Sequence, residues 1–152
     1  MKGRIALPYL LPLAYLLAGC AGVLQSPPVP DPEAFPGIAG QFGRFGVELL
    51  NWTAGDPGCD DPNLSPTSIR FEVQGLDQAT PVQLRIYIFR NREAWQRRLA
   101  DVDTCAAAWA VDPATFERLQ VSPYVLAGQG PWPPQFDDAV RKAIQEAAGN
   151  GG

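Results

Sequence analysis

The sequence predicts an α+β domain over residues 40–149, with about four strands in a mainly antiparallel sheet and two helices packed on one face. Three segments show the period-two alternation of half-buried strands, and two later segments show the spacing of three and four that is typical of amphipathic helices. The three strands follow one another with no helix between them, which favours an antiparallel meander covered by helices on one face.

Alternation of apolar and polar residues predicts the first strand over 45–52, the second over 69–74 and the third over 82–89. Residues 75–81 are expected to form the turn between the second and third strands. The third strand has the clearest alternation, and its β-branched and aromatic residues suit a central position in the sheet.

A long helix is expected after Asn91, whose side chain can cap its first turn. The apolar stripe of this helix runs from Trp95 to Trp109, and Cys105 lies beside the stripe. Asp112 and Pro113 then form the pattern of an N-cap followed by the first helical residue, which predicts a short helical turn ending at Leu119.

The last part of the domain is predicted as a strand over 121–127, a stiff turn over 128–134 and a final helix over 136–147. Pro123 lacks a backbone N–H, so we expect it at an edge or a bulge of that strand. Gly149 closes the helix, and residues 150–152 form a glycine-rich tail.

The beginning of the chain has the parts of an export signal in order. Lys2 and Arg4 supply positive charge, the segment 5–18 is apolar, and Cys20 follows two small residues. The stretch 16–20, which reads Leu-Leu-Ala-Gly-Cys, resembles the lipobox of bacterial lipoproteins. The resemblance implies that residues 1–19 are removed and that Cys20 becomes the lipidated, palmitate-bearing N-terminus of an extracytoplasmic protein.

The residue after the cysteine bears on which membrane holds the protein. In bacteria with two membranes, Ala21 in place of an aspartate implies the outer membrane, and otherwise the resemblance implies the outer face of the cell membrane. Two alternatives stay open. Residues 5–24 are long enough to cross a bilayer, although Pro8 and Pro12 weaken a helix there. Plain secretion would leave Cys20 as an unpaired thiol.

A tether over residues 20–39 is expected to separate the lipid from the domain. Five prolines lie within 25–36, and this composition favours an extended polyproline II segment of about 3.1 Å per residue. Without residues 1–19, the chain has 10 basic and 16 acidic residues and a net charge of −6. This balance argues against nucleic-acid binding, and it leaves the lipid as the expected contact with the membrane.

Cys59 and Cys105 are the cysteines that remain after Cys20 is assigned to lipid. An even pair in an oxidising compartment predicts a disulfide, and two buried thiols are the alternative. The loop would span 46 residues, for which the chain-entropy model gives about 4 kcal/mol. The bond would attach the long helix to the loop 54–66.

Sites for catalysis or metal binding are few. The chain has no histidine for a catalytic triad, and Lys142 is the lysine that remains after residues 1–19. Glu48 and Glu72 lie on neighbouring predicted strands, but alternation points both toward water. The loop residues Asp56, Asp60 and Asp61 offer the oxygen ligands that calcium prefers, in a segment that also has the composition of an ordinary turn.

Two surfaces are candidates for binding a partner. Trp132 lies between prolines near Tyr124 and Gln129, and it either anchors a partner or folds back as a hydrophobic plug. Four arginines surround the start of the long helix, where helical spacing also predicts a salt-bridged, solvated face. They are Arg90, Arg92, Arg97 and Arg98.

The sequence therefore predicts a lipid-anchored binding or envelope-associated domain that is not an enzyme and needs no cofactor. Its expected partners are the membrane, through the lipid, and an envelope protein or ligand whose identity the sequence does not give. A carboxylate- or cation-dependent enzyme and a purely structural envelope component are the alternatives.

Overall fold

The computed structural model describes residues 34–149, which form three α-helices, five strands and one turn of 3-10 helix. In chain order they are α1 (Ala34–Arg44), β1 (Glu48–Ala54), η1 (Ser65–Thr67), β2 (Ser68–Gly75), β3 (Gln78–Ile88), α2 (Arg92–Trp109), β4 (Phe116–Val121), β5 (Tyr124–Gln129) and α3 (Pro134–Gly149). The α+β class is as predicted, with one helix and one strand more than expected.

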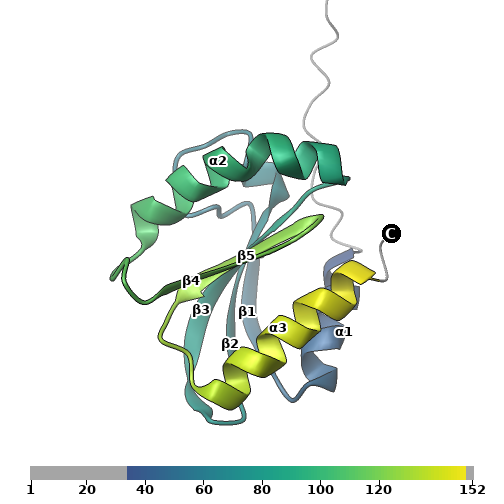
Figure 1. The fold of residues 1–152 in the computed structure, drawn as a ribbon, viewed down its shortest axis with the longest axis vertical. Coiled ribbons are helices and arrows are strands. Elements are labelled where there is room, and N and C mark those ends of the chain that lie inside the picture. The colour runs from purple at the N-terminus through teal and green to yellow at the C-terminus, as the bar shows by residue number, and fades with distance from the viewer. Residues whose placement is uncertain (1–33, 150–152) are drawn as a thin grey trace, which may run out of the picture.

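The five strands form a single open sheet in the order β1-β2-β3-β5-β4, and every neighbouring pair is antiparallel (Figure 1). β3 is the central strand, as its alternation and composition predicted. The turn before it is shorter than expected, because β3 begins at Gln78 and Leu76 adopts a positive φ of 54° in the turn.

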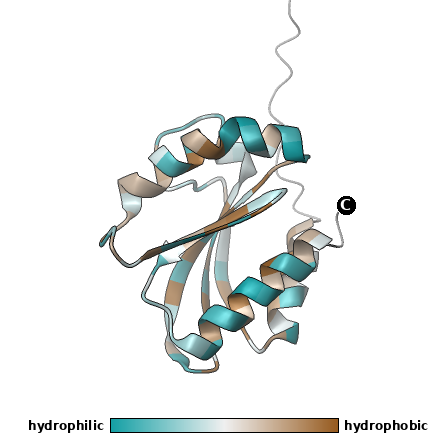
Figure 2. Cartoon of the chain, viewed as in Figure 1, coloured by the Kyte–Doolittle hydropathy of each residue, from teal (hydrophilic) through white to brown (hydrophobic). Residues whose placement is uncertain are grey.

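Helices cover both faces of the sheet, so the prediction that they share one face is wrong. α1 and α3 lie on one side and α2 on the other (Figure 1). β3 explains the difference, because it is buried on both faces. Leu84 and Ile86 pack toward α1 and α3, whereas Tyr87 and Phe89 pack toward α2. Hydrophobic residues are prominent along the strands, and α3 carries hydrophilic residues on much of its visible side (Figure 2).

The smaller core beneath α2 contains the predicted disulfide. Cys59 and Cys105 are joined by an S–S bond of 2.03 Å, which fixes α2 to the loop between β1 and β2. The predicted cap of α2 is also confirmed, because the Asn91 side chain accepts a hydrogen bond from the Ala94 backbone N–H at 2.8 Å.

α1 lies where the sequence predicted the end of the tether. Residues 34–39 belong to this helix, and its apolar side chains Phe35, Ile38 and Phe42 are buried in the larger core. Pro36 is compatible with the helix because it falls in the first turn, where no intrahelical hydrogen bond needs its N–H.

β4 replaces the short helical turn that the sequence predicted up to Leu119. Residues 112–115 form a turn held by the Asp112 side chain, and the chain then pairs with β5 along its whole length. Leu119 is buried in the larger core. Pro123 lies in the two-residue connection from β4 to β5, rather than at an edge or bulge of a strand.

The lipobox-like stretch, Cys20 and residues 20–33 of the tether lie outside the described residues, as does the tail 150–152. Within residues 34–149, no helix has both the length and the apolar character needed to cross a bilayer.

Candidate binding site on the open half of the sheet

The face of the sheet that carries α2 is only half covered. α2 and the loop after β1 pack over β3 and β5, whereas the corresponding face of β1 and β2 carries polar residues outside both hydrophobic cores. We call this surface the open face. Its polar side chains come from Glu48, Thr53, Arg70, Glu72 and Gln74, with Gln83 of β3 at the border, and Leu50 is the apolar residue among them.

Two arginines face each other at the border between the open face and the covered half. Arg70 of β2 and Arg85 of β3 are direct partners in the antiparallel register. Like charges in such a pair are unfavourable unless a counter-charge lies between them. Asp56 supplies it, because its carboxylate lies 2.9 Å from Arg70 Nε and 3.2 Å from Arg85 Nη2.

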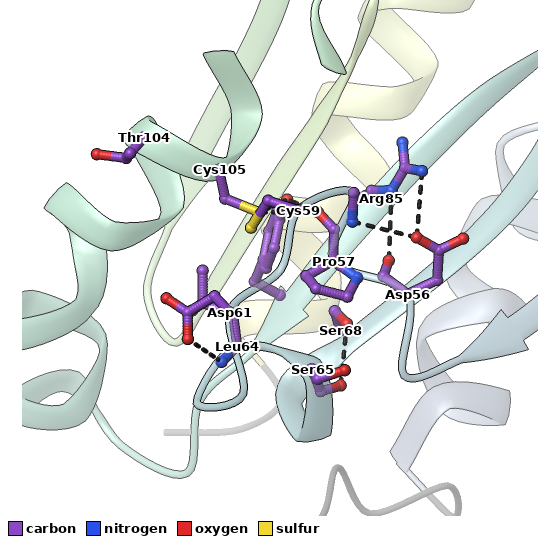
Figure 3. The surroundings of a disulfide bond; sticks show 12 residues. Asp56, Pro57, Cys59, Asp61, Leu64, Ser65, Ser68, Arg85, Thr104 and Cys105 are labelled. Atoms are coloured by element: carbon purple, nitrogen blue, oxygen red, sulfur yellow. Dashed lines mark hydrogen bonds and ion pairs between the residues drawn. A yellow bond between two sulfur atoms is a disulfide. The ribbon is translucent and has the colours of Figure 1, made fainter. Parts of the chain in front are cut away.

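The loop after β1 holds Asp56 in this position (Figure 3). Gly55, with a φ of 83°, turns the chain, and its N–H donates to the carbonyl of Ser68 at 2.9 Å. The Asp56 carboxylate also accepts from the Gly58 N–H at 3.1 Å, and Arg85 Nε donates to the Asp56 carbonyl at 3.3 Å. The disulfide at Cys59 fixes the other end of this segment.

Arg85 is unusually buried for an arginine, with 7% of its surface exposed. Its guanidinium carbon lies 4.4 Å from the centre of the Trp109 ring, in a cation–π contact. The indole can pack this closely because residue 58 is a glycine. A Cβ at Gly58 would lie only 2.3 Å from Trp109 Cδ1. Ala127 is the β5 partner of Arg85 in the antiparallel register.

The buried hydrogen-bond donors of this cluster are incompletely satisfied. Among residues 34–149, three buried side-chain nitrogens have no hydrogen-bond partner, and all three lie here: Arg70 Nε, Arg85 Nη1 and Trp109 Nε1. Arg70 Nε is close enough to Asp56 for an ion pair but not aligned for a hydrogen bond. Arg85 Nη1 points away from Asp56 (Figure 3). Two guanidinium groups thus share one carboxylate, which leaves one positive charge in excess.

Tyr87 lies beneath the same loop. Its hydroxyl donates to the Pro57 carbonyl at 2.7 Å, and burial raises the pKa of the phenol above its ordinary value of 10.0. The neighbouring Trp109 and Arg85 oppose this increase in pKa but do not cancel it. Tyr87 is therefore a neutral hydrogen-bond donor that helps to fix the loop on the sheet.

The three aspartates that were candidates for a cation site do not converge. Asp56 binds the two arginines, whereas Asp61 accepts from the backbone N–H groups of Asn63 and Leu64 at 2.7 and 3.1 Å. Asp60 is exposed. Within the described part of the chain, no three histidine, cysteine or acidic side chains are grouped in a way that would hold a metal ion.

Of the three candidates for partner binding, Trp132 and Tyr124 are buried and Gln129 is half-buried in a turn. Trp132 is 8% exposed and packs edge-on against Phe136, which is the arrangement expected of a hydrophobic plug. Tyr124 is also buried. Gln129 holds the turn before β4, where its side-chain oxygen accepts from the N–H groups of Val111 and Asp112 at 3.0 Å.

The two glutamates do lie on one face, the open face, but each carboxylate binds an amide. Glu48 accepts from Gln74 at 2.9 Å, and Glu72 accepts from Asn51 at 2.8 Å. On α2, Arg97 pairs with Glu93, and Arg98 pairs with Asp101 at 2.8 Å.

Arg90 and Arg92 are the remaining members of the arginine group, and both are exposed. Of the four arginines around the start of α2, Arg97 and Arg98 therefore belong to a salt-bridged, solvated face.

Sequence patterns do not single out Arg70 or Arg85, and they place Trp109 only in the apolar stripe of the long helix. Both arginines alternate with apolar residues on their strands, which is also the pattern of ordinary solvent-facing positions. Two arginines at such positions on consecutive antiparallel strands, with an acidic loop before them, are the signal that could have identified the pair. The chain matches no protein-family model, no curated protein and no solved structure.

Proposed function

We propose that the protein is a lipid-anchored extracytoplasmic domain that binds a ligand or envelope partner and does not catalyse a reaction. The observation that carries the binding role is the open face, where a polar sheet surface borders two arginines that share one carboxylate. A face with a purely structural role would be expected to pair each buried charge with its own partner.

Two features support the anchored, exported state. Cys20 occupies the acceptor position of the lipobox-like stretch. The disulfide between Cys59 and Cys105 suits an oxidising compartment, where such bonds persist.

The non-enzymatic role is supported by how the acid–base groups are used. The chain contains no histidine. Glu48 and Glu72 bind amides, and Lys142 pairs with Asp138 at 2.7 Å on α3, the helix on the opposite side of the sheet from the open face.

Membrane attachment is tested by fractionating cells that express the Cys20→Ala variant. The proposal expects the variant to leave the membrane fraction and to lose incorporation of labelled palmitate. The matched control replaces Cys59 and Cys105 together with serine, which removes the disulfide and leaves Cys20. This control should stay in the membrane fraction, and retention of Cys20→Ala there would reject the lipid anchor.

Binding is tested by placing a photo-reactive amino acid at Thr53 of the membrane-bound protein in intact cells. Thr53 is exposed on the open face and lies directly opposite Arg70. Glu146, exposed on α3 on the other side of the molecule, is the matched control position. The proposal expects a discrete adduct from Thr53 and none from Glu146. Equal labelling from both positions would reject the open face as the binding surface.

A further inference from the structure

We propose that Arg70, Arg85 and Trp109 form a subsite for one carboxylate group of the ligand that lies on the open face. The inference rests on the proposed binding role and adds the chemistry of the group that is recognised. It begins from the excess positive charge of the arginine pair, since Asp56 is the carboxylate shared by both guanidinium groups.

Among residues 34–149, the acidic residue that forms an ion pair with the two arginines is Asp56. Glu72 lies two residues from Arg70 on the same strand, and its carboxylate is engaged by Asn51. Within residues 34–149, Glu72 forms no ion pair with either arginine. Arg118 provides the contrast, because it lies on the same cross-sheet row, opposite Ala127, and has its own carboxylate in Asp103.

The donors that remain free define the kind of ligand. Arg85 Nη1 is buried, has no hydrogen-bond partner and points away from Asp56 (Figure 3). A guanidinium presents its N–H groups in a planar fork that matches a carboxylate. Asp56 bridges the pair with one carboxylate oxygen toward each arginine, and a second carboxylate on the other side would give each guanidinium its own counter-charge. One added negative charge balances the site, whereas a dianionic group would exceed it.

The approach to the subsite is from the open face. The side chains of Arg70 and Asp56 are 38% and 35% exposed, whereas that of Arg85 is 8% exposed. A ligand therefore meets Arg70 first. Trp109 is half-buried beside the subsite, with its ring centre 4.4 Å from the guanidinium carbon of Arg85. Its indole N–H lies beside the Tyr87 hydroxyl without a well-aligned hydrogen bond, and it is a further donor for an oxygen of the ligand.

The experiment uses NMR spectroscopy to follow the Nε–Hε resonances of the arginines. The sample is the full mature chain, which is purified from membranes in a neutral detergent and kept at constant ionic strength. Sodium acetate, sodium dimethyl phosphate and neutral acetamide are the probes. The inference expects acetate to shift the resonances of Arg70 and Arg85 saturably, to leave Arg118 unchanged, and to bind more tightly than dimethyl phosphate. Acetamide should shift none of them.

Variants assign the effect to the subsite. Arg70→Gln should weaken acetate binding about tenfold, which is the order expected for one hydrogen bond to a charged group. Arg70→Lys should weaken it less, and Arg118→Gln should leave it unchanged. Backbone amide spectra establish that each variant is folded. Wild-type affinity in folded Arg70→Gln, or equal shifts at Arg118, would overturn the inference. So would equal or tighter binding of dimethyl phosphate.

The outcome separates this inference from the proposed function. If acetate does not bind but the photo-adduct at Thr53 forms, the carboxylate subsite is wrong and the binding surface stands. If neither is observed, the proposed binding role fails as well.

Discussion

Arg70 and Arg85 lie directly opposite each other on neighbouring strands, and their guanidinium groups share the carboxylate of Asp56. The pair joins the loop after β1 to the sheet and marks the border of the open face. The same three side chains therefore stabilise the fold and leave charge available to a ligand. Stability and binding can be measured separately.

Asp56→Asn should lower the free energy of unfolding by about 1–3 kcal/mol, because it removes the counter-charge of a buried arginine. Asp60→Asn is the matched control on the same loop. Asp60 is exposed, so its replacement should change the stability by about 0.5 kcal/mol or less. Urea unfolding of both variants checks the difference, and equal stabilities would show that Asp56 does not hold the pair.

Gly58→Ala should destabilise the protein more than Gly55→Ala. Both glycines have a positive φ, 86° and 83°, so an alanine costs about 1–2 kcal/mol at either position. At Gly58 the new methyl group also meets Trp109, whereas at Gly55 nothing lies within 4 Å. The clash should add about 1–3 kcal/mol in urea unfolding and change the tryptophan fluorescence. Equal losses at the two positions would contradict the close packing of Trp109 on Gly58.

Trp132→Ala should cost about 3–5 kcal/mol of stability, as expected for a large aromatic removed from a core. Trp52 is the comparison, because it is 57% exposed and packs with one side against Phe35. Trp52→Ala should cost about 1 kcal/mol or less. Thermal or urea unfolding measures both, and a small loss for Trp132→Ala would mean that the indole is a surface contact after all.

Stability should decrease in alkaline solution because of Tyr87. Its pKa is raised by burial, so the folded protein retains the phenolic proton at a pH where the unfolded chain has lost it. The native state then binds more protons, and the free energy of unfolding falls as the pH rises above the ordinary value of 10.0.

Urea unfolding at increasing pH measures this decrease. Tyr87→Phe should reduce the slope, and Tyr124→Phe should do the same, because burial also raises the pKa of Tyr124. A slope that neither substitution changes would contradict this assignment.

Local patterns predict the parts of the fold whose buried sides differ clearly from their exposed sides. Alternation in β2 and β3 and the stripe of α2 are of this kind. α1 was missed because Pro36 and three glycines give it the composition of a linker. β4 was missed because Asp112 and Pro113 have the pattern of a helix start, although their turn leads into a strand.

The site depends on relationships that the sequence does not contain. Arg70 lies opposite Arg85 because of the register between β2 and β3. Asp56 contacts both arginines because of the path of the loop after β1, which the disulfide links to α2. The side of the sheet on which α2 packs is likewise set by tertiary contacts, because β3 has apolar residues on both faces. Trp109 was assigned to the stripe of α2, yet it packs on Arg85 and Phe116.

The central claim is that the open face binds a ligand through the arginine pair. Its most direct test compares the photo-adduct from Thr53 in wild-type, Arg70→Gln and Arg118→Gln proteins in intact cells. The account predicts that Arg70→Gln loses most of the adduct while its membrane level stays unchanged, and that Arg118→Gln forms the adduct as the wild type does. An adduct of undiminished yield in Arg70→Gln would contradict the claim.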